Sequence, residues 1–446
     1  MRFRIYIVLS LLWVFLSCIP ESIISNTPAT FSGALLDVKL LGGSNEEVAR
    51  ALIPLRNGGF AMVGSTNSSD GDFVDRSSDD WDMFLMVLDG EGAPIWKKSY
   101  GGSGDDFGFS LVETPERGFV LCGYSNSQDG DVPPTQGYHD NWVIKVDDKG
   151  TIIWKKSMGY AGHDHAYNII ATQDGGYFFN GYLDVTASGG LGNSDKTAIS
   201  NRHGVGEFWC HKIDTNGEIL WQRYFGGTNN DRSYDAIQTT EGNFLVLGTS
   251  ESDDTDVTNA KGSYDLWAIM ISPDGTLLWE KSFGGKLIDE GSKVIEDFSG
   301  NFRIIGNTFS NDQDVLYAKG SSDIWQITLD PSGNIIENNS WGGSEFDKGT
   351  SIAYWQWGSF FVAGYSRSSD GDFLNNQGEN DLFVMHLPPN GYPPQTYSLG
   401  GADHDYAFDL LALKNGKVMV VGQTYSSELY GQKNKGKSDI LIAQWH

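Results

Sequence analysis

Residues 101–158 read GGSGDDFGFSLVETPERGFVLCGYSNSQDGDVPPTQGYHDNWVIKVDDKGTIIWKKSM. This stretch contains four short runs of β-branched, aromatic and aliphatic residues, centred on Leu111, Leu121, Ile144 and Trp154. Gly, Asp, Asn and Pro separate the runs, and these residues favour turns. The stretch therefore predicts four short β-strands joined by tight turns and by one longer acidic loop.

The same unit occurs seven times along the chain. The units begin at Gly42, Gly101, Gly159, Gly226, Gly284, Gly342 and Gly400, and only the third is much longer than the others. Position +22 from each start is glycine: Gly64, Gly123, Gly181, Gly248, Gly306, Gly364 and Gly422. Position +5 is always acidic: Glu47, Asp106, Asp164, Asp231, Asp289, Asp347 and Asp405. A second acidic column, near +39, contains Asp82, Asp140, Glu207, Asp265, Asp323, Asp381 and Asp439. Repeated units of four strands predict the blades of a β-propeller.

The two ends of the chain predict how the ring closes. The last unit stops at His446, before its fourth strand, whereas residues 33–41 match the fourth strand of the second unit, residues 150–158. An N-terminal strand that completes the last blade would remove two open sheet edges. We therefore predict an all-β fold, a seven-bladed β-propeller of four-stranded antiparallel blades, that spans residues 31–446.

The first residues predict export and lipidation. Arg2 and Arg4 precede an apolar run, residues 5–16, as in a signal peptide. The following Phe15-Leu-Ser-Cys18 resembles the lipobox of bacterial lipoproteins. The resemblance implies a signal peptide over 1–17, a lipid on Cys18, a tether over 18–30, and an extracytoplasmic protein anchored to an envelope membrane, with the outer membrane favoured. The alternatives are an ordinary cleaved signal peptide and an uncleaved anchor.

Charge and cysteine usage exclude some classes of function. The chain has 31 basic and 58 acidic residues, a net charge of −27, so nucleic acid and anionic membrane surfaces are not expected partners. Membrane contact is expected only through the lipid anchor. Besides Cys18, the cysteines are Cys122 and Cys210, each in a strand-like run, which predicts buried free thiols.

Three hairpin segments resemble a known group of repeats. Residues 147–154, 214–221 and 273–279 are similar to the Asp-x-x-Gly-x-x-x-Trp pattern of quinoprotein-like propeller repeats. The whole unit also resembles repeats of secreted bacterial lipoproteins, some of them described as bulb-lectin-like. Glu337 and Gln395 replace the Trp in the fifth and sixth units. The resemblance implies the fold, but such propellers include scaffolds, binding proteins and enzymes.

Paired aspartates mark the loops between the second and third strands of five units. The pairs are Asp70 with Asp72, Asp129 with Asp131, Asp254 with Asp256, Asp312 with Asp314, and Asp370 with Asp372. Such residues cap backbone N–H groups in Asx turns, which we take as the favoured role. Clustered carboxylates also suit Ca²⁺, and calcium at these loops is the alternative. No other cofactor is indicated. We expect the +5 and near-+39 carboxylates to accept backbone hydrogen bonds in each blade.

The third unit departs from the others. It lacks the paired aspartates and gains nine residues within 182–205. This insertion contains the basic residues Lys196, Arg202 and His203. It lies in the loop between the second and third strands, and we call the side of the ring where these loops are predicted to emerge the loop face. His163 and His165 flank Asp164 and lie on one side of an extended strand, which suits a transition metal. The sequence offers no third ligand for this pair other than His404, four blades away, so a metal role is not favoured.

These observations favour a monomeric, non-catalytic binding protein. Its acidic loop face would hold a protein or glycan ligand, with Tyr138, Tyr264 and Tyr317 as candidate aromatic contacts. One alternative is a polysaccharide lyase or glycosidase in which His163, His165 or loop carboxylates act. The other is a structural scaffold of the cell envelope. An acid–base pair converging on one pocket would indicate an enzyme, and contacts along the outer strands would indicate a scaffold.

Overall fold

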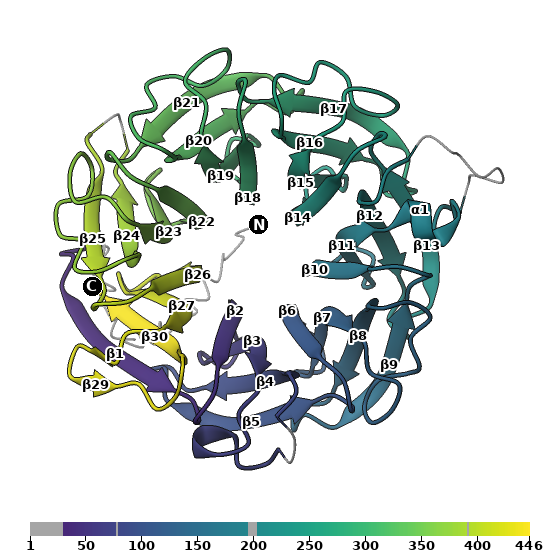
Figure 1. Ribbon diagram of the computed structural model, residues 1–446, viewed down its shortest axis with the longest axis horizontal. Coiled ribbons are helices and arrows are strands. Elements are labelled where there is room, and N and C mark those ends of the chain that lie inside the picture. Colours follow the sequence, from purple (N-terminus) through teal and green to yellow (C-terminus); the bar gives the residue numbers. More distant parts are fainter. Residues whose placement is uncertain (1–29, 77–78, 195–202, 390–391) are drawn as a thin grey trace, which may run out of the picture.

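The computed structural model describes residues 30–76, 79–194, 203–389 and 392–446. Seven four-stranded antiparallel sheets stand in a ring around a central axis (Figure 1), which confirms the predicted seven-bladed propeller. In the described residues, no helix is long and apolar enough to span a bilayer. The predicted signal peptide, Cys18 and the tether up to residue 29 lie outside the described residues.

The strands run outward from the axis in chain order within each blade. The first three blades are β2 (Glu47–Pro54), β3 (Phe60–Thr66), β4 (Asp82–Leu88) and β5 (Pro94–Tyr100); β6 (Asp106–Glu113), β7 (Phe119–Ser125), β8 (Asp140–Val146) and β9 (Ile152–Met158); and β10 (His165–Ala171), β11 (Tyr177–Leu183), β12 (Glu207–Ile213) and β13 (Ile219–Phe225). The next three are β14 (Asp231–Gln238), β15 (Phe244–Ser250), β16 (Asp265–Ile271) and β17 (Leu277–Phe283); β18 (Asp289–Glu296), β19 (Phe302–Thr308), β20 (Asp323–Leu329) and β21 (Ile335–Trp341); and β22 (Asp347–Tyr354), β23 (Phe360–Ser366), β24 (Asp381–Leu387) and β25 (Gln395–Leu399).

The seventh blade joins both ends of the chain. Its strands are β26 (Asp405–Ala412), β27 (Val418–Thr424), β30 (Asp439–Trp445) and the N-terminal β1 (Leu35–Leu41). β1 pairs antiparallel with β30, with Val38 opposite Ala443 and Leu40 opposite Leu441. The predicted closure is therefore confirmed. Short elements in the loops are η1 (Gly71–Phe73), α1 (Val185–Ser188) and the hairpin β28 (Glu428–Leu429) with β29 (Gln432–Lys433).

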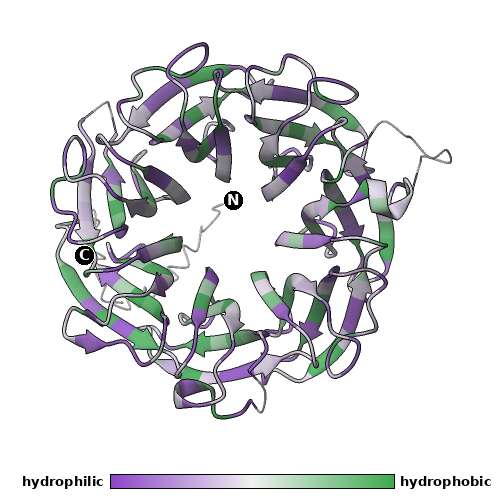
Figure 2. Ribbon diagram, viewed as in Figure 1, coloured by the Kyte–Doolittle hydropathy of each residue, from purple (hydrophilic) through white to green (hydrophobic). Residues whose placement is uncertain are grey.

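The core lies between successive blades. Trp142 on β8 is fully buried and packs in one cluster with Ala61 and Leu85 of the preceding blade. Equivalent buried tryptophans occupy the third strands of the next three blades: Trp209, Trp267 and Trp325. Apolar residues recur in the strands of every blade, whereas the connecting loops are mostly polar (Figure 2). Cys122 and Cys210 are free and buried, as predicted.

The glycine at +22 allows the two innermost strands of each blade to approach closely. A Cβ atom on Gly123 would lie 1.7 Å from the backbone oxygen of Phe107 on the neighbouring strand. In all seven blades the corresponding distance is between 1.7 and 1.9 Å. The register of β6 and β7 shifts at this place, between Gly108 and Ser110. The repeated glycine is therefore required by the irregular pairing of the inner strands.

The acidic residue at +5 fastens the start of each inner strand. Asp106 is fully buried and accepts a hydrogen bond of 2.7 Å from the backbone N–H of Gly102 and one of 2.9 Å from the hydroxyl of Ser127. The backbone bond recurs in all seven blades, at 2.6–3.0 Å. Burial raises the pKa of Asp106 to about 7, against the opposing effect of these hydrogen bonds. The expected backbone-capping role of this column is confirmed.

Candidate functional site

The inner strands of all seven blades surround a central channel that contains a cavity of about 430 Å³. Each of these strands contributes at least one side chain, and Phe109, Tyr167, Tyr234 and Phe408 give the wall its aromatic surface. Cavities of this size are typical of small-molecule sites. Sequence reasoning placed the binding surface on the loop face and did not identify this cavity.

Most charges in the cavity are paired. Lys348 Nζ lies 2.7 Å from Glu290 Oε2, and Lys293 Nζ lies 3.4 Å from Asp235 Oδ1. The neighbouring carboxylate of Asp235 holds the pKa of Lys293 above its ordinary value. Asp409 accepts hydrogen bonds from the backbone N–H of Leu52, at 2.9 Å, and from the hydroxyl of Ser351, at 2.8 Å. These groups hold one another in place within the wall.

Arg50 is the exception. Its guanidinium carbon lies 4.4 Å from the ring centre of Phe408 and 5.4 Å from that of Phe109. Within the described parts of the chain, it makes no ion pair or side-chain hydrogen bond. Burial lowers the pKa of Arg50 from its ordinary value, but an arginine in a protein remains charged. The channel therefore holds a cation whose hydrogen-bond donors are available to an anion.

The first aspartate of each loop pair caps a backbone group. Its carboxylate accepts the N–H of the residue at +2 of its own blade, at 2.7–2.9 Å in all five blades. The five carboxylates are those of Asp70, Asp129, Asp254, Asp312 and Asp370. This geometry supports the favoured interpretation of these residues as caps.

The second aspartate of the pair has a similar role in four blades. Its carboxylate accepts the N–H of the first glycine of the unit, at 2.8 Å in Asp72, 3.3 Å in Asp256, 3.3 Å in Asp314 and 2.9 Å in Asp372. Asp131, in the remaining blade, donates its backbone N–H to the carbonyl oxygen of Gly101 at 2.8 Å. The second position therefore ties the acidic loop to the start of the unit.

Lysines lie beside three of these second carboxylates. Lys435 Nζ is 2.5 Å from Asp72, Lys319 Nζ is 2.7 Å from Asp372, and Lys261 Nζ is 3.6 Å from Asp314. An ammonium group at this place competes with a bound cation for the same oxygen atoms.

The loops do not bring their aspartates together as the calcium alternative requires. In the described residues, none of the ten belongs to a group of three or more acidic or histidine side chains close enough to hold an ion. A calcium ion would need further oxygen ligands, since it takes six to eight. At Asp72, Asp256, Asp314 and Asp372, as at the five first aspartates, the carboxylate caps a backbone N–H, which favours capping over the metal role. Asp131 contributes its backbone N–H instead. Calcium at these loops stays a prediction.

We expect Asp370→Ala to lower the free energy of unfolding by about 1 kcal/mol, because Ser344 then loses the acceptor of its backbone N–H. The measurement is urea denaturation in EDTA, with Asp148→Ala, an exposed turn residue, as the matched control. Equal stability of the two variants would contradict the capping role. Addition of millimolar Ca²⁺ tests the alternative, since a rise in Tm that is lost in Asp129→Asn would establish a calcium site.

The remaining residues predicted from sequence are dispersed. Tyr264 is half-buried and its hydroxyl donates to Glu251, whereas Tyr317 is exposed on another blade. His203 is buried, with Nδ1 at 3.2 Å from Glu207 Oε2. Lys196 and Arg202 lie outside the described residues. Among those that the structure describes, only Tyr138 is brought to another predicted residue, since its ring stacks on that of His163 with 5.3 Å between centres.

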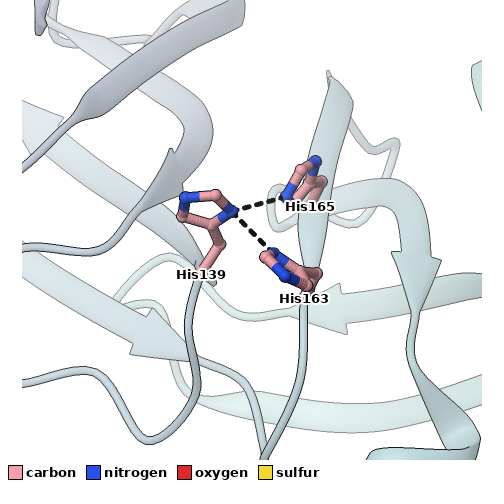
Figure 3. Close-up of side chains that lie close together, drawn as sticks. All are labelled: His139, His163 and His165. Carbon is pink, nitrogen blue, oxygen red and sulfur yellow. Dashed lines mark hydrogen bonds between the residues drawn. The ribbon is translucent and has the colours of Figure 1, made fainter.

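The structure adds a third histidine to His163 and His165. His139 Nδ1 lies 2.9 Å from His163 Nδ1 and 3.1 Å from His165 Nε2 (Figure 3). His139 ends the loop before β8, His165 begins β10 of the next blade, and His163 lies two residues before that strand. His404, the third ligand considered from sequence, instead lies against Asn380 in another part of the ring.

The repeat contains a signal that identifies His139. His139 and His163 form a parallel β-bridge between blades, and the same bridge joins Tyr264 to Ile288 and Ser322 to Phe346. Position +38 of one blade thus lies beside position +4 of the next. Inspection of these two columns together would have paired the two histidines.

The surroundings of two of the three imidazoles lower their pKa values. Burial lowers the pKa of His139, and burial together with the other two histidines lowers the pKa of His165 to about 3. His163 is exposed on the loop face. In the described parts of the chain, this is the one group of three or more His, Cys, Asp or Glu side chains arranged closely enough to hold a metal ion.

Comparisons with known proteins identify no family. No family model matches the chain, and no curated protein matches it. Similar solved structures include the WD40 domain of Pan2 from Neurospora crassa, at 9% identity and a TM-score of 0.49 over 93% of this chain and 97% of that one. Drosophila Plexin A in complex with Semaphorin 1b has 8% identity and a TM-score of 0.46, over 92% and 87% of the two chains. Puromycin hydrolase has 11% identity and a TM-score of 0.47, over 89% and 53%. These proteins are of diverse kinds, and similarities this low indicate nothing about function.

Proposed function

We propose that this protein is a non-catalytic, extracytoplasmic binding protein, anchored as a monomer through a lipid on Cys18, that binds an acidic glycan in its central channel. The observation that carries the proposal is the unpaired guanidinium of Arg50 between two phenylalanine rings in the wall of the cavity. A guanidinium binds a carboxylate with two parallel hydrogen bonds. A uronic acid residue supplies that carboxylate.

The rest of the wall supports a sugar as the ligand. Phe109 and Phe408 give the wall apolar surface beside Arg50 for the C–H groups of a pyranose ring, and Tyr167 and Tyr234 add hydroxyls that both donate and accept hydrogen bonds. A few placed polar groups on a mainly aromatic wall are the usual means of orienting a small ligand. The cavity volume of about 430 Å³ is large enough for a monosaccharide.

The same wall favours binding over catalysis. An enzyme of the lyase or glycosidase type needs an acid and a base free to act on one ligand. Here Lys293 and Lys348 are each paired with a carboxylate, and Asp409 accepts three hydrogen bonds from the protein. Arg50 can bind and orient a carboxylate but is too strongly basic to exchange a proton at neutral pH.

The test is isothermal titration of the full-length protein in detergent with glucuronate and galacturonate, and with glucose and galactose as neutral counterparts. We expect the uronates alone to bind, and Arg50→Gln to weaken binding by about tenfold to a hundredfold. Arg56→Gln, an exposed arginine on the turn after β2, is the matched control and should bind as the wild type does. Absence of uronate binding, or binding unchanged in Arg50→Gln, would overturn the proposal.

One observation favours the scaffold alternative. In the described residues, six of the seven outermost strands, one in each blade, expose an aliphatic side chain at their second position. These side chains are Leu36, Ile95, Ile153, Leu220, Leu278 and Ile336. A belt of this kind would suit contacts along the outer strands. The same titration separates the two functions, because a scaffold gives no heat with any of the four sugars.

A further inference from the structure

The three histidines between the second and third blades occupy a place apart from the channel cavity, whose wall includes none of them. We propose that His139, His163 and His165 form a binding site for one divalent transition-metal ion, with zinc as the expected ion. The proposal does not depend on the glycan proposal, since none of the three ligands lines the cavity; among the described residues, Tyr167 alone contacts both places.

The distances between the nitrogens fit shared coordination. Zn–N bonds of about 2.0–2.1 Å at tetrahedral angles place two ligand nitrogens about 3.3 Å apart. His139 Nδ1 lies 2.9 Å from His163 Nδ1 and 3.1 Å from His165 Nε2, and all three ligand atoms lie within 4.8 Å of one another. Small side-chain rotations therefore bring all three nitrogens to one ion.

Hydrogen bonding alone explains this arrangement poorly. An imidazole nitrogen carries either one proton or one lone pair. His139 Nδ1 faces two other ring nitrogens (Figure 3), so it cannot make a good hydrogen bond to both. An ion at the point where the three nitrogens converge accepts a lone pair from each, and it removes this conflict.

Neighbouring side chains orient the imidazoles. His165 Nδ1 lies 3.2 Å from the hydroxyl of Tyr167, which leaves Nε2 as the ligand atom. Tyr124 stacks on His165, with ring centres 3.6 Å apart and an angle of 11° between the planes. Metal-ligating histidines commonly have such a hydrogen-bond partner on the second nitrogen.

The donor set and its exposure define the class of metal. Neutral imidazole nitrogens suit zinc, copper, nickel and iron, whereas calcium and magnesium prefer oxygen. Three protein ligands leave a coordination position for water or another small ligand, in contrast to closed structural zinc sites with four. The exposure of His163 gives an ion a route from solvent.

The test is zinc titration of the full-length protein, after EDTA treatment and removal of the chelator. We expect one equivalent of Zn²⁺ to bind, and Co²⁺ to give the visible absorption of a nitrogen-coordinated ion. His163→Ala should weaken zinc binding by at least about a hundredfold, because even the loss of an outer-shell partner commonly costs tenfold to a hundredfold. His163 is exposed, so the variant should fold. His404→Gln, at the same offset in the seventh blade, is the matched control and should bind zinc normally.

Two results would overturn the proposal: less than one equivalent of zinc at saturation, or equal affinity in the wild type and His163→Ala. X-ray absorption of the zinc-loaded wild type gives a check that needs no variant. Scattering from three imidazoles supports the site, and a shell of oxygen ligands alone contradicts it.

Discussion

Replacing Gly123 by alanine is expected to prevent stable folding. The added Cβ would lie 1.7 Å from the backbone oxygen of Phe107 and 2.8 Å from its carbonyl carbon. Both atoms belong to the backbone of the neighbouring strand, so no change of side-chain rotamer relieves the clash. The two inner strands of the blade must separate instead, and they are packed against the blades on either side. We expect a loss of at least about 3 kcal/mol in the free energy of unfolding.

The control for this prediction is a glycine with room for a methyl group. A Cβ on Gly206 would be 3.7 Å from the nearest atoms, in the side chains of Arg232 and Asn230, so Gly206→Ala is expected to change stability by no more than about 0.5 kcal/mol. Circular dichroism and urea denaturation compare the two variants. Failure of Gly123→Ala to give soluble protein, with normal yield of Gly206→Ala, meets the prediction. Equal stability would show that the inner strands can separate at little cost.

The fold was predictable because every blade must satisfy the same physical demands. Only glycine at +22 leaves room for the backbone of the neighbouring strand, and the carboxylate at +5 accepts a hydrogen bond from a backbone N–H at the start of the unit. The close approach of the strands and the backbone N–H that needs an acceptor recur in each blade, so both residues recur in the sequence at a fixed spacing. The N-terminal strand was predictable for the same reason, since the last unit lacks a strand that all the others possess.

The candidate sites were harder to predict because they depend on residues that do not repeat. Positions +8 on the inner strands hold Arg50, Phe109, Tyr167, Tyr234, Ser292, Thr350 and Phe408. All of them line the channel cavity. Side chains that face the axis do not pack between blades, so the fold does not require a particular residue type at these positions and function can determine it. Variation in a column of otherwise regular repeats is therefore a signal for a site.

His139 shows a second reason. The same offset in another blade holds His404, which lies against Asn380 and far along the ring from His163. In a ring of blades, the neighbours of a loop are residues of the adjacent blade at a different offset. The bridge between +38 and +4 places His139 beside His163, although 24 residues separate them.

Replacing Leu40 by aspartate is expected to open the ring. Leu40 on β1 is 5% exposed and pairs with Leu441 of β30. It belongs to the strand that completes the seventh blade and lies in the apolar cluster that the sixth and seventh blades share. An aspartate there would place a carboxylate without a partner in an apolar interface, which costs about 3–5 kcal/mol. Detachment of β1 avoids that cost by exposing the edge of β30 to water.

The two outcomes have different signatures, and both differ from the control. If β1 stays paired, the variant unfolds in one transition at a lower urea concentration than the wild type. If β1 detaches, an early unfolding transition precedes the main one, and the exposed edge of β30 promotes aggregation. Leu36→Asp on the same strand is the matched control, because Leu36 is 47% exposed and its substitution should have little effect. Equal stability of the two variants would mean that β1 adds little to closure. The ring would then be held by contacts between the first and seventh blades through β2, β26 and β27, and the exchange of a strand between the chain ends would be dispensable for folding.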